Sequence, residues 1–374
     1  MSRAPYKFLD YYRFEDADLF FGREEETRRM VGEILSTRLL ALFSPSGSGK
    51  TSLIEAGVRP QLEEMGYRTV YTRLEEEPIP SVCRAVAKAL AIPDYDTSGG
   101  QGRFLKKLPL HPAKTFDDNS GEDTFDSGQT DLHHFLKEAA KKTGQPLVIF
   151  LDQFEEFFTV FRNRPELRRE FIEQVAKIKY DDRLPVFLVL SLREDYFANL
   201  HEFRDVIPSI FENNANIRLQ PFTREAARRA VERPLEAVGW SIEPGLVDTL
   251  LDDLQKEGTG IEPITLQLVC GTLWHKSRDT EERQITVSTY RACGGADSIL
   301  QTFIHDRLRE VPGRQHKLMV RTFEVLKTPD NTKRFRTYDD LRSQLNIKRP
   351  GRFDSLLEKL SNREILRREE RAGT

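Results

Sequence analysis

The sequence predicts an α/β protein whose first part is built on a parallel β-sheet. Three short apolar runs read as buried strands, because strands covered on both faces are continuously apolar. They are "RLLALF" (38–43), "PLVIFLD" (146–152) and "LPVFLVLSL" (184–192), and "YRTVYTRL" (67–74) is a weaker fourth. Helix-like segments separate them, at about 24–37, 50–64, 79–91, 130–143 and 166–178. Strands that alternate with helices favour a parallel sheet.

The strand pattern ends near residue 219, and the rest of the chain reads as helical. Apolar residues recur there at helical spacing, as in "PGLVDTLLDDLQKEG" (244–258), and Thr223 is placed to cap a helix. From about 312 the pattern is three short helices and a strand-like "EILRREE", the order of a winged helix; "TYDD" opens one of these helices, with Thr337 as N-cap. We therefore expect an α/β domain over 1–218, a helical domain over 219–310 and a truncated winged-helix domain over 311–374.

One stretch inside the α/β domain breaks the alternation. Residues 93–129 are rich in Gly, Asp, Ser and Pro and contain few apolar positions. A connection of this length inside a compact domain is usually functional or disordered. We interpret it as a flexible insertion.

Composition and charge exclude several classes of protein. The chain is 38% hydrophobic and 31% charged, and its net charge of −3 gives no overall attraction to nucleic acid or to anionic membranes. Its three cysteines form no C-x-x-C pair, which favours a reducing compartment. No run approaches the length of a membrane span, and the N-terminus has no apolar signal segment. A cytoplasmic protein is expected.

A glycine-rich turn follows the first predicted strand, in "LLALFSPSGSGKTSLIEAG" (39–57). A strand, such a turn and a helix start form a phosphate-binding loop, in which backbone N–H groups converge on phosphate oxygens. Gly47 and Gly49 supply the turn, Lys50 the positive charge and Thr51 a hydroxyl ligand for Mg²⁺. The expected nucleotide-binding residues are Ser46, Gly47, Ser48, Gly49, Lys50, Thr51 and Ser52. The usual first glycine of the pattern is replaced by Ser44.

A second acidic motif, "VIFLDQFEEFF", begins at the end of another predicted strand. An enzyme with a phosphate-binding loop needs an acidic residue at the end of a neighbouring strand to hold Mg²⁺. Asp152 takes this place, so Thr51 and Asp152 are the predicted metal site. Glu155 and Glu156 are predicted catalytic carboxylates, of which the first can orient or deprotonate the attacking water. The alternative is that these acidic residues only cap a strand end and begin a helix. The phosphate-binding loop elsewhere in the sequence favours the catalytic role.

Arg193 ends the third apolar run, in "VFLVLSLRED". A cation there can reach the γ-phosphate or stabilise transition-state charge, so Arg193 joins Lys50, Asp152, Glu155 and Glu156 as a predicted catalytic residue. The alternative is a surface salt bridge with Glu194 or Asp195. "SGGQ" (98–101) mimics the motif of ABC transporter ATPases but lies in the insertion, some 50 residues before Asp152.

These motifs, in this order, resemble the STAND ATPases, and most closely the bacterial novel-STAND group. The likeness covers nearly the whole chain and implies a P-loop NTPase core of AAA+ type with a helical lid and a winged helix, binding ATP or ADP with Mg²⁺. In "FFGRE" (20–24), Gly22, Arg23 and Glu24 match the adenine pocket of the family. In "GIEPITLQLVCGTLW" (260–274), Pro263 matches a lid proline that packs near the base.

The chain departs from this family pattern at two places. Ser44 replaces a glycine, and the sequence stops at "ILRREERAGT", before the family's Tyr-Glu-Leu-x-His-Asp-like segment. No residue can be assigned to the histidine of that segment. We therefore expect the chain to be a fragment of a longer protein.

The favoured function is an ATP-operated switch with slow hydrolysis, forming a homo-oligomer in the ATP state. Antiphage defence is implied only by the resemblance, and neither the trigger nor the effector can be identified. The main alternative is a DNA-loading ATPase, because residues 314–374 contain 16 Lys and Arg against 9 Asp and Glu, a balance of +7. The predicted recognition helix of the winged helix, "RPGRFDSLLEKLSNRE", alternates in the sign of its charges, which is typical of a solvated face. A pseudo-ATPase scaffold is a third possibility.

Overall fold

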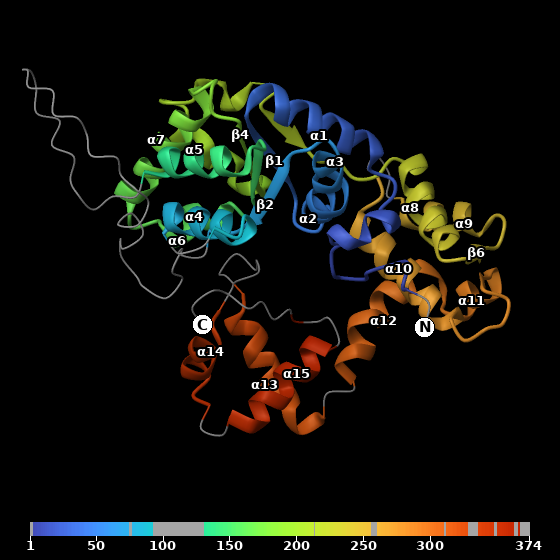
Figure 1. Cartoon of the computed structure of the whole chain (residues 1–374). Coiled ribbons are helices and arrows are strands. Elements are labelled where there is room, and N and C mark those ends of the chain that lie inside the picture. The colour runs from blue at the N-terminus through green and yellow to red at the C-terminus, as the bar shows by residue number, and fades with distance from the viewer. Residues whose placement is uncertain are drawn as a thin grey trace, which may run out of the picture. The chain divides into compact units, whose positions relative to one another are not determined.

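The structure is a computed structural model of the chain (Figure 1). It describes residues 3–74, 77–92, 131–212, 214–255, 260–309, 312–327, 336–347, 350–362 and 366. The chain divides into two compact units: Tyr12–Gln220, and Met1–Tyr11 together with Pro221–Thr374. The predicted insertion and all of the predicted terminal strand except Leu366 lie outside the described residues.

The first unit is built on a five-stranded parallel sheet with strand order β2-β3-β4-β1-β5. Its strands are β1 (Leu39–Ser44), β2 (Arg68–Thr72), β3 (Leu147–Leu151), β4 (Val186–Arg193) and β5 (Asn216–Arg218). All residues of β1 and β3 are buried, as their apolar runs predicted. The apolar runs of the sequence do not predict β5, which has only three residues. The acidic motif is predicted on a strand next to β1, whereas β4 separates β3 from β1.

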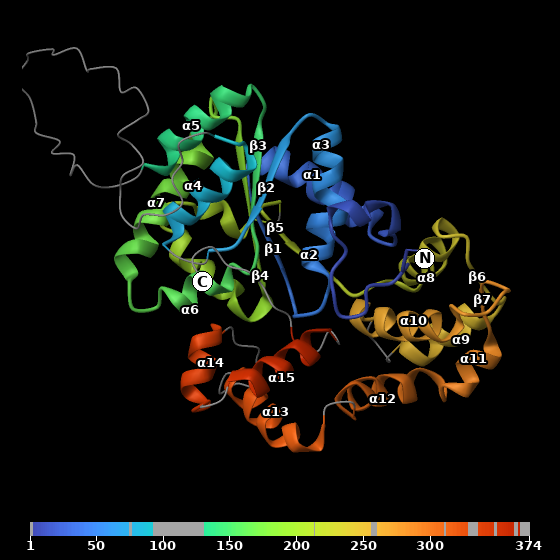
Figure 2. The same ribbon diagram turned by 60° about the horizontal axis from the view of Figure 1, so that its bottom comes forward.

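Helices cover both faces of this sheet, as Figure 2 shows. Successive side chains of a strand point to opposite faces. Thus Leu39 and Ala41 pack with the helices α4, α5 and α7, whereas Leu40 and Leu42 pack with α1 and with the segment that follows the glycine-rich turn. One apolar core therefore lies on each face of the sheet. In open α/β sheets, ligands bind at the edge formed by the carboxyl ends of the strands.

Helices occupy all five predicted segments of the first unit, and its described residues form four more helices that the sequence did not predict. The helices of this unit are η1 (Phe14–Leu19), α1 (Glu24–Thr37), α2 (Lys50–Ser52), η2 (Leu53–Val58), α3 (Arg59–Glu64), α4 (Pro78–Ala89), α5 (Leu132–Thr143), α6 (Glu155–Val160), α7 (Pro165–Tyr180), η4 (Glu194–Phe203) and η5 (Pro208–Phe211). The segment predicted as one helix over 50–64 is interrupted by the π-helical η2. This change of geometry precedes Pro60, which has no N–H to donate within a helix.

The second unit is mainly helical. Its helices up to residue 309 are α8 (Arg224–Ala237), α9 (Leu246–Leu254), α10 (Pro263–Ser277), α11 (Val287–Ala292) and α12 (Gly295–Arg309), with a short parallel pair, β6 (Ser241–Ile242) and β7 (Gln284–Ile285). Thr223 caps α8 as predicted, because its hydroxyl accepts the Ala226 N–H at 3.2 Å. Tyr6 lies in this core, where its hydroxyl donates to the Val231 carbonyl at 2.6 Å. That contact explains why the N-terminal residues group with the helical unit.

Three more helices follow in the second unit: α13 (Gly313–Val325), α14 (Tyr338–Gln344) and α15 (Pro350–Asn362). Buried Leu356 and Leu360 pack with Met319, and the Thr337 hydroxyl caps α14 by accepting the Asp340 N–H at 3.2 Å. The winged-helix assignment stays a prediction, because the wing falls outside the described residues. In the described part of the chain, no helix has the length and apolar character needed to cross a membrane.

Candidate nucleotide site

The loop between β1 and α2 has the backbone conformation that its two glycines predict. Gly47 and Gly49 adopt φ of 84° and 88°, in the left-handed region that side chains disfavour. A Cβ on Gly49 would meet nothing within 4 Å, so it is the backbone angle that requires glycine there. Ser48 braces the turn by donating to the Pro45 carbonyl at 2.9 Å, while Ser46 and Gly47 are exposed.

Lys50 lies at the start of the helix after this loop and bends back over it. Its ammonium donates to the Ser44 carbonyl at 3.1 Å, to the Ser44 hydroxyl at 3.2 Å and to the Pro45 carbonyl at 3.3 Å. Burial lowers the pKa of Lys50, and the carboxylates of Glu155 and Asp152 oppose this effect. The structure thus places the predicted lysine beside both predicted acidic residues.

Asp152 follows β3 and is almost fully buried, with 2% of its surface exposed. Three hydroxyl groups donate to its carboxylate. Thr51 donates to Oδ2 at 2.8 Å, Tyr71 donates to the same oxygen at 2.7 Å, and Ser191 donates to Oδ1 at 2.7 Å. A buried carboxylate needs such partners, because an unpaired charge in the interior is costly. The pair predicted to hold Mg²⁺, Thr51 and Asp152, is therefore in direct contact.

The donor set around Asp152 fits Mg²⁺ bound together with a nucleotide. The described residues contain no group of three or more His, Cys, Asp or Glu side chains that could hold a metal alone. Mg²⁺ at phosphate-binding sites does not need one, since it uses one or two protein oxygens, substrate phosphates and water. A threonine hydroxyl and an adjoining carboxylate supply those protein oxygens here.

Glu155 begins α6, three residues after Asp152. One of its oxygens accepts the backbone N–H of Arg193 at 3.2 Å, so the ends of β3 and β4 are joined through this carboxylate. Burial raises the pKa of Glu155, while the positive charge of Lys50 lowers it. Glu156 is buried in the same helix. The negative charge of Glu155 also acts on Lys50, where it raises the pKa of the ammonium against the effect of burial.

Arg193 ends β4 opposite Ser44 in the parallel register of β1 and β4. Its guanidinium is held by Asp195, through Nε at 3.0 Å and a terminal nitrogen at 2.7 Å, and lies over the ring of Tyr196. The register brings Arg193 to the edge of the sheet where Lys50 lies. The salt bridge that was the alternative interpretation of this arginine is also present.

The remaining predicted residues of the first unit are Gly22, Arg23 and Glu24, which lie at the start of α1, and Ser52, which lies in α2. Gly22 has φ of 87° and donates its N–H to the Glu24 carboxylate at 2.7 Å. Arg23 is buried, pairs with Glu26 and donates to the Gln220 carbonyl at 2.8 Å. The Ser52 hydroxyl accepts the Tyr12 N–H at 3.2 Å. The Phe20 ring lies so close to Gly57 that a Cβ added to this glycine would be 3.1 Å from the ring. Phe20 and Tyr12 thus adjoin the loop helix.

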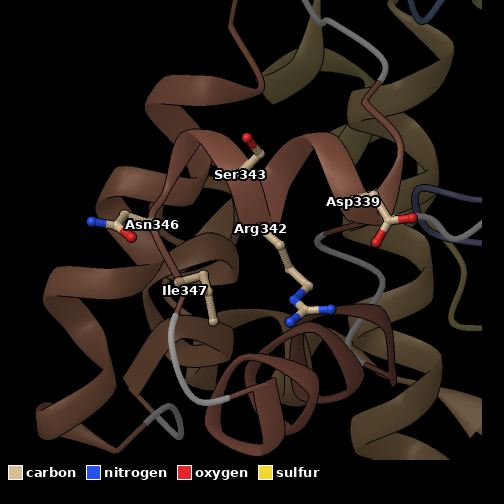
Figure 3. A pocket seen from close by; sticks show the side chains of 5 residues that line it. All are labelled: Asp339, Arg342, Ser343, Asn346 and Ile347. Atoms are coloured by element: carbon tan, nitrogen blue, oxygen red, sulfur yellow. The ribbon is translucent and has the colours of Figure 1, made fainter.

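Pro263 belongs to the second unit, where it is buried at the first turn of α10. That unit also has a small surface pocket lined by Asp339, Arg342, Ser343, Asn346 and Ile347, all from α14 and the turn after it (Figure 3). The pocket shares no residue with the predicted site.

The sequence motifs did not indicate Tyr71 and Ser191, which contact Asp152, or Glu55, on which the charge of Asp152 acts. Tyr71 lies on the weakest predicted strand, and Ser191 lies two residues before Arg193 in an apolar run, so neither carried a motif. Glu55 lies in η2, where burial raises the pKa of its carboxyl and Arg59 bonds both of its oxygens at 2.8 Å. The only available signal was a polar side chain within an otherwise apolar, buried segment.

Comparison with solved structures supports the predicted fold. The ORC2 protein of Aeropyrum pernix is 13% identical, with a TM-score of 0.51 over 91% of this chain and 85% of that chain. A Walker-type ATPase of Pyrococcus abyssi is 18% identical, with a TM-score of 0.46 over 95% and 93%, and Aeropyrum pernix ORC1, solved with DNA, is 17% identical, with 0.47 over 93% and 85%. The ORC2 likeness agrees with the α/β class. No curated protein matches the chain.

The family comparison covers nearly the whole sequence. A family model described as novel STAND NTPase 1 matches residues 5–372. The matched range includes the glycine-rich loop, the acidic motif that follows β3 and the helices of the second unit. The resemblance drawn from the motifs is confirmed, and the chain belongs to the novel STAND NTPase 1 family.

Proposed function

We propose that this NTPase is an ATP- and ADP-binding switch that hydrolyses ATP slowly with Mg²⁺ and changes its assembly state with the nucleotide. The contact between Thr51 and Asp152 carries the proposal. It joins the hydroxyl of the phosphate loop to the acidic motif 101 residues later in the chain. Lys50 and Glu155 lie beside this pair. A loop that binds no nucleotide would not need a lysine, a threonine hydroxyl and two carboxylates in one place.

Each residue has a role that its chemistry suits. The N–H groups of the loop from Gly47 to Thr51 would bind phosphate oxygens at the start of a helix. The Lys50 ammonium would leave the Ser44 and Pro45 carbonyls to neutralise phosphate charge. Mg²⁺, held by Thr51 and Asp152, would supply charge neutralisation on the phosphates. Glu155 would accept a proton from the attacking water, and its partly buried position suits a general base.

The switch itself requires different affinities for two conformations. A nucleotide shifts a conformational equilibrium only if it binds one state more tightly than the other. The γ-phosphate distinguishes ATP from ADP, and Arg193 is the cation at the strand ends proposed to detect it. Pro263 is proposed to contact the base, as the resemblance to the family implies. Signalling and antiphage defence would depend on partners outside this chain.

The decisive experiment measures binding of labelled ATP and ADP to the wild-type chain and to Lys50→Ala. We expect at least tenfold weaker binding of both nucleotides by Lys50→Ala. Lys142→Ala is the matched control, because Lys142 is an exposed lysine in α5. It should bind both nucleotides like wild type. Equal affinities in wild type and Lys50→Ala would disprove the site.

Assembly is tested separately, by light scattering after size-exclusion chromatography. Glu155→Gln should trap the ATP state, so ATP with Mg²⁺ should give a larger particle than ADP does. The same mass with both nucleotides would contradict nucleotide-controlled oligomerisation while leaving nucleotide binding intact.

Duplex-DNA binding is the second candidate function, supported by the balance of +7 over residues 314–374. Binding through phosphate contacts weakens steeply as salt rises. An electrophoretic shift at two salt concentrations tests it. Salt-sensitive binding that persists at physiological ionic strength would favour this function over the switch.

A further inference from the structure

Tyr71 contributes a polar group to the site that no motif predicted. It lies on β2 opposite Phe150 of the neighbouring strand β3, and Asp152 follows two residues after Phe150. Alternate residues of a strand share a face, so this register brings the phenol to the carboxylate. The Tyr71 hydroxyl donates to Asp152 Oδ2 at 2.7 Å.

The three hydroxyl groups around Asp152 differ in what they can do when a metal binds. An ionised carboxylate has about four acceptor directions on its two oxygens. Tyr71 and Thr51 occupy Oδ2, and Ser191 occupies Oδ1. Thr51 is the proposed metal ligand, so its hydroxyl oxygen would turn to Mg²⁺. Tyr71 and Ser191 come from strands on either side of β3 and can keep their bonds.

We infer that Tyr71, assisted by Ser191, is a positioning residue that holds the Asp152 carboxylate in the orientation that binds Mg²⁺. The inference rests on the proposed function. A partner that orients a metal-binding group usually changes metal affinity about 10-fold or more when it is removed. Because Tyr71 does not itself bind nucleotide in this scheme, its loss should act only when Mg²⁺ is present.

The test compares Tyr71→Phe with wild type by titrating Mg²⁺ against a fluorescent ATP analogue, and by repeating the nucleotide titration in EDTA. Tyr71→Phe keeps the ring and removes only the hydroxyl. We expect about tenfold weaker Mg²⁺ affinity and metal-free nucleotide binding within about twofold of wild type. Ser191→Ala should shift Mg²⁺ affinity in the same direction, from the other carboxylate oxygen.

Tyr67→Phe is the matched control. Tyr67 precedes β2 and packs edge-on against Phe187, and its hydroxyl makes no hydrogen bond to any residue that the structure describes. This variant should bind Mg²⁺ and nucleotide like wild type. Thermal unfolding in EDTA shows whether each variant is folded.

The outcomes separate the two proposals. Unchanged or tighter Mg²⁺ binding by folded Tyr71→Phe and Ser191→Ala would overturn the positioning role, and the switch would stand. An equal loss of binding with and without Mg²⁺ would also overturn it, because that would indicate a structural effect. A wild-type chain that binds no nucleotide would refute the proposed function and this inference together.

Discussion

The ammonium of Lys50 lies 3.2 Å from the hydroxyl of Ser44, the residue that replaces the usual first glycine of the loop. Ser44 is fully buried at the end of β1 and is not among the residues with positive φ, so its side chain costs no backbone strain. Its hydroxyl also donates to the Pro45 carbonyl at 3.3 Å. The substitution therefore preserves the loop and adds a contact to its lysine.

Ser44→Gly should change nucleotide affinity by less than about threefold, or roughly 0.6 kcal/mol. Lys50 keeps its contacts with the Ser44 and Pro45 carbonyls in this variant, and only the hydroxyl is lost. Isothermal titration with ADP measures the effect. Gly49→Ala is the contrasting variant and should weaken binding at least tenfold, because alanine disfavours φ of 88°. A large gain in affinity for Ser44→Gly would instead mean that the natural loop is impaired.

Glu155→Gln should slow ATP hydrolysis by about 100-fold or more while binding ATP like wild type. Glutamine keeps the size of the side chain and cannot accept a proton. In the wild type, a carboxyl base works only when deprotonated, and burial raises the pKa of Glu155 above its ordinary value of 4.5. The hydrolysis rate should therefore fall with decreasing pH, through a pKa above 4.5. Single-turnover rates between pH 4.5 and 8 check both expectations.

The control for this variant is Glu156→Gln, which removes the neighbouring carboxylate. A larger loss of hydrolysis in Glu156→Gln than in Glu155→Gln would transfer the role of base to Glu156. An acid limb that persists unchanged in Glu155→Gln would show that another group titrates.

Asp195→Asn should increase the preference for ATP over ADP. Asp195 holds the Arg193 guanidinium through two hydrogen bonds but is itself about half exposed, at 53%. Exposed ion pairs contribute about 0.2–1 kcal/mol, so releasing the arginine should change the ratio by no more than about fivefold. Competition of ATP and ADP for a labelled nucleotide measures this ratio. Arg193→Ala should lower it, and equal ratios in all three proteins would exclude Arg193 as a γ-phosphate sensor.

Phe157→Ala should destabilise the first unit by about 3–5 kcal/mol, because it removes a buried aromatic ring. Phe157 is fully buried and lies within 5.3 Å of the Phe158 and Phe171 ring centroids. Urea unfolding measures the loss. Val160→Ala, in the same helix, is the control: Val160 is 57% exposed, and its substitution should change stability by no more than about 0.5 kcal/mol. Similar losses in both variants would contradict the assigned core.

Local chemistry made much of this molecule predictable from the sequence. Continuous apolar runs indicated strands buried on both faces, and the cap residues Thr223 and Thr337 marked helix starts that the structure confirms. The glycine spacing of the loop implied positive φ, which both glycines adopt. Such features depend on a residue and its near neighbours in the chain, so a single sequence contains them.

Only the tertiary structure decided which distant groups meet. The insertion of β4 between β1 and β3 brings Arg193 opposite Ser44 and Ser191 to Asp152. The register of β2 adds Tyr71 to the same carboxylate. These contacts depend on strand order and register, which result from the burial of whole sheet faces and have no local pattern. The sequence by itself therefore determined the glycine-rich turn and predicted Asp152 as its acidic partner, and the packing of the sheet decided which hydroxyl groups surround Asp152.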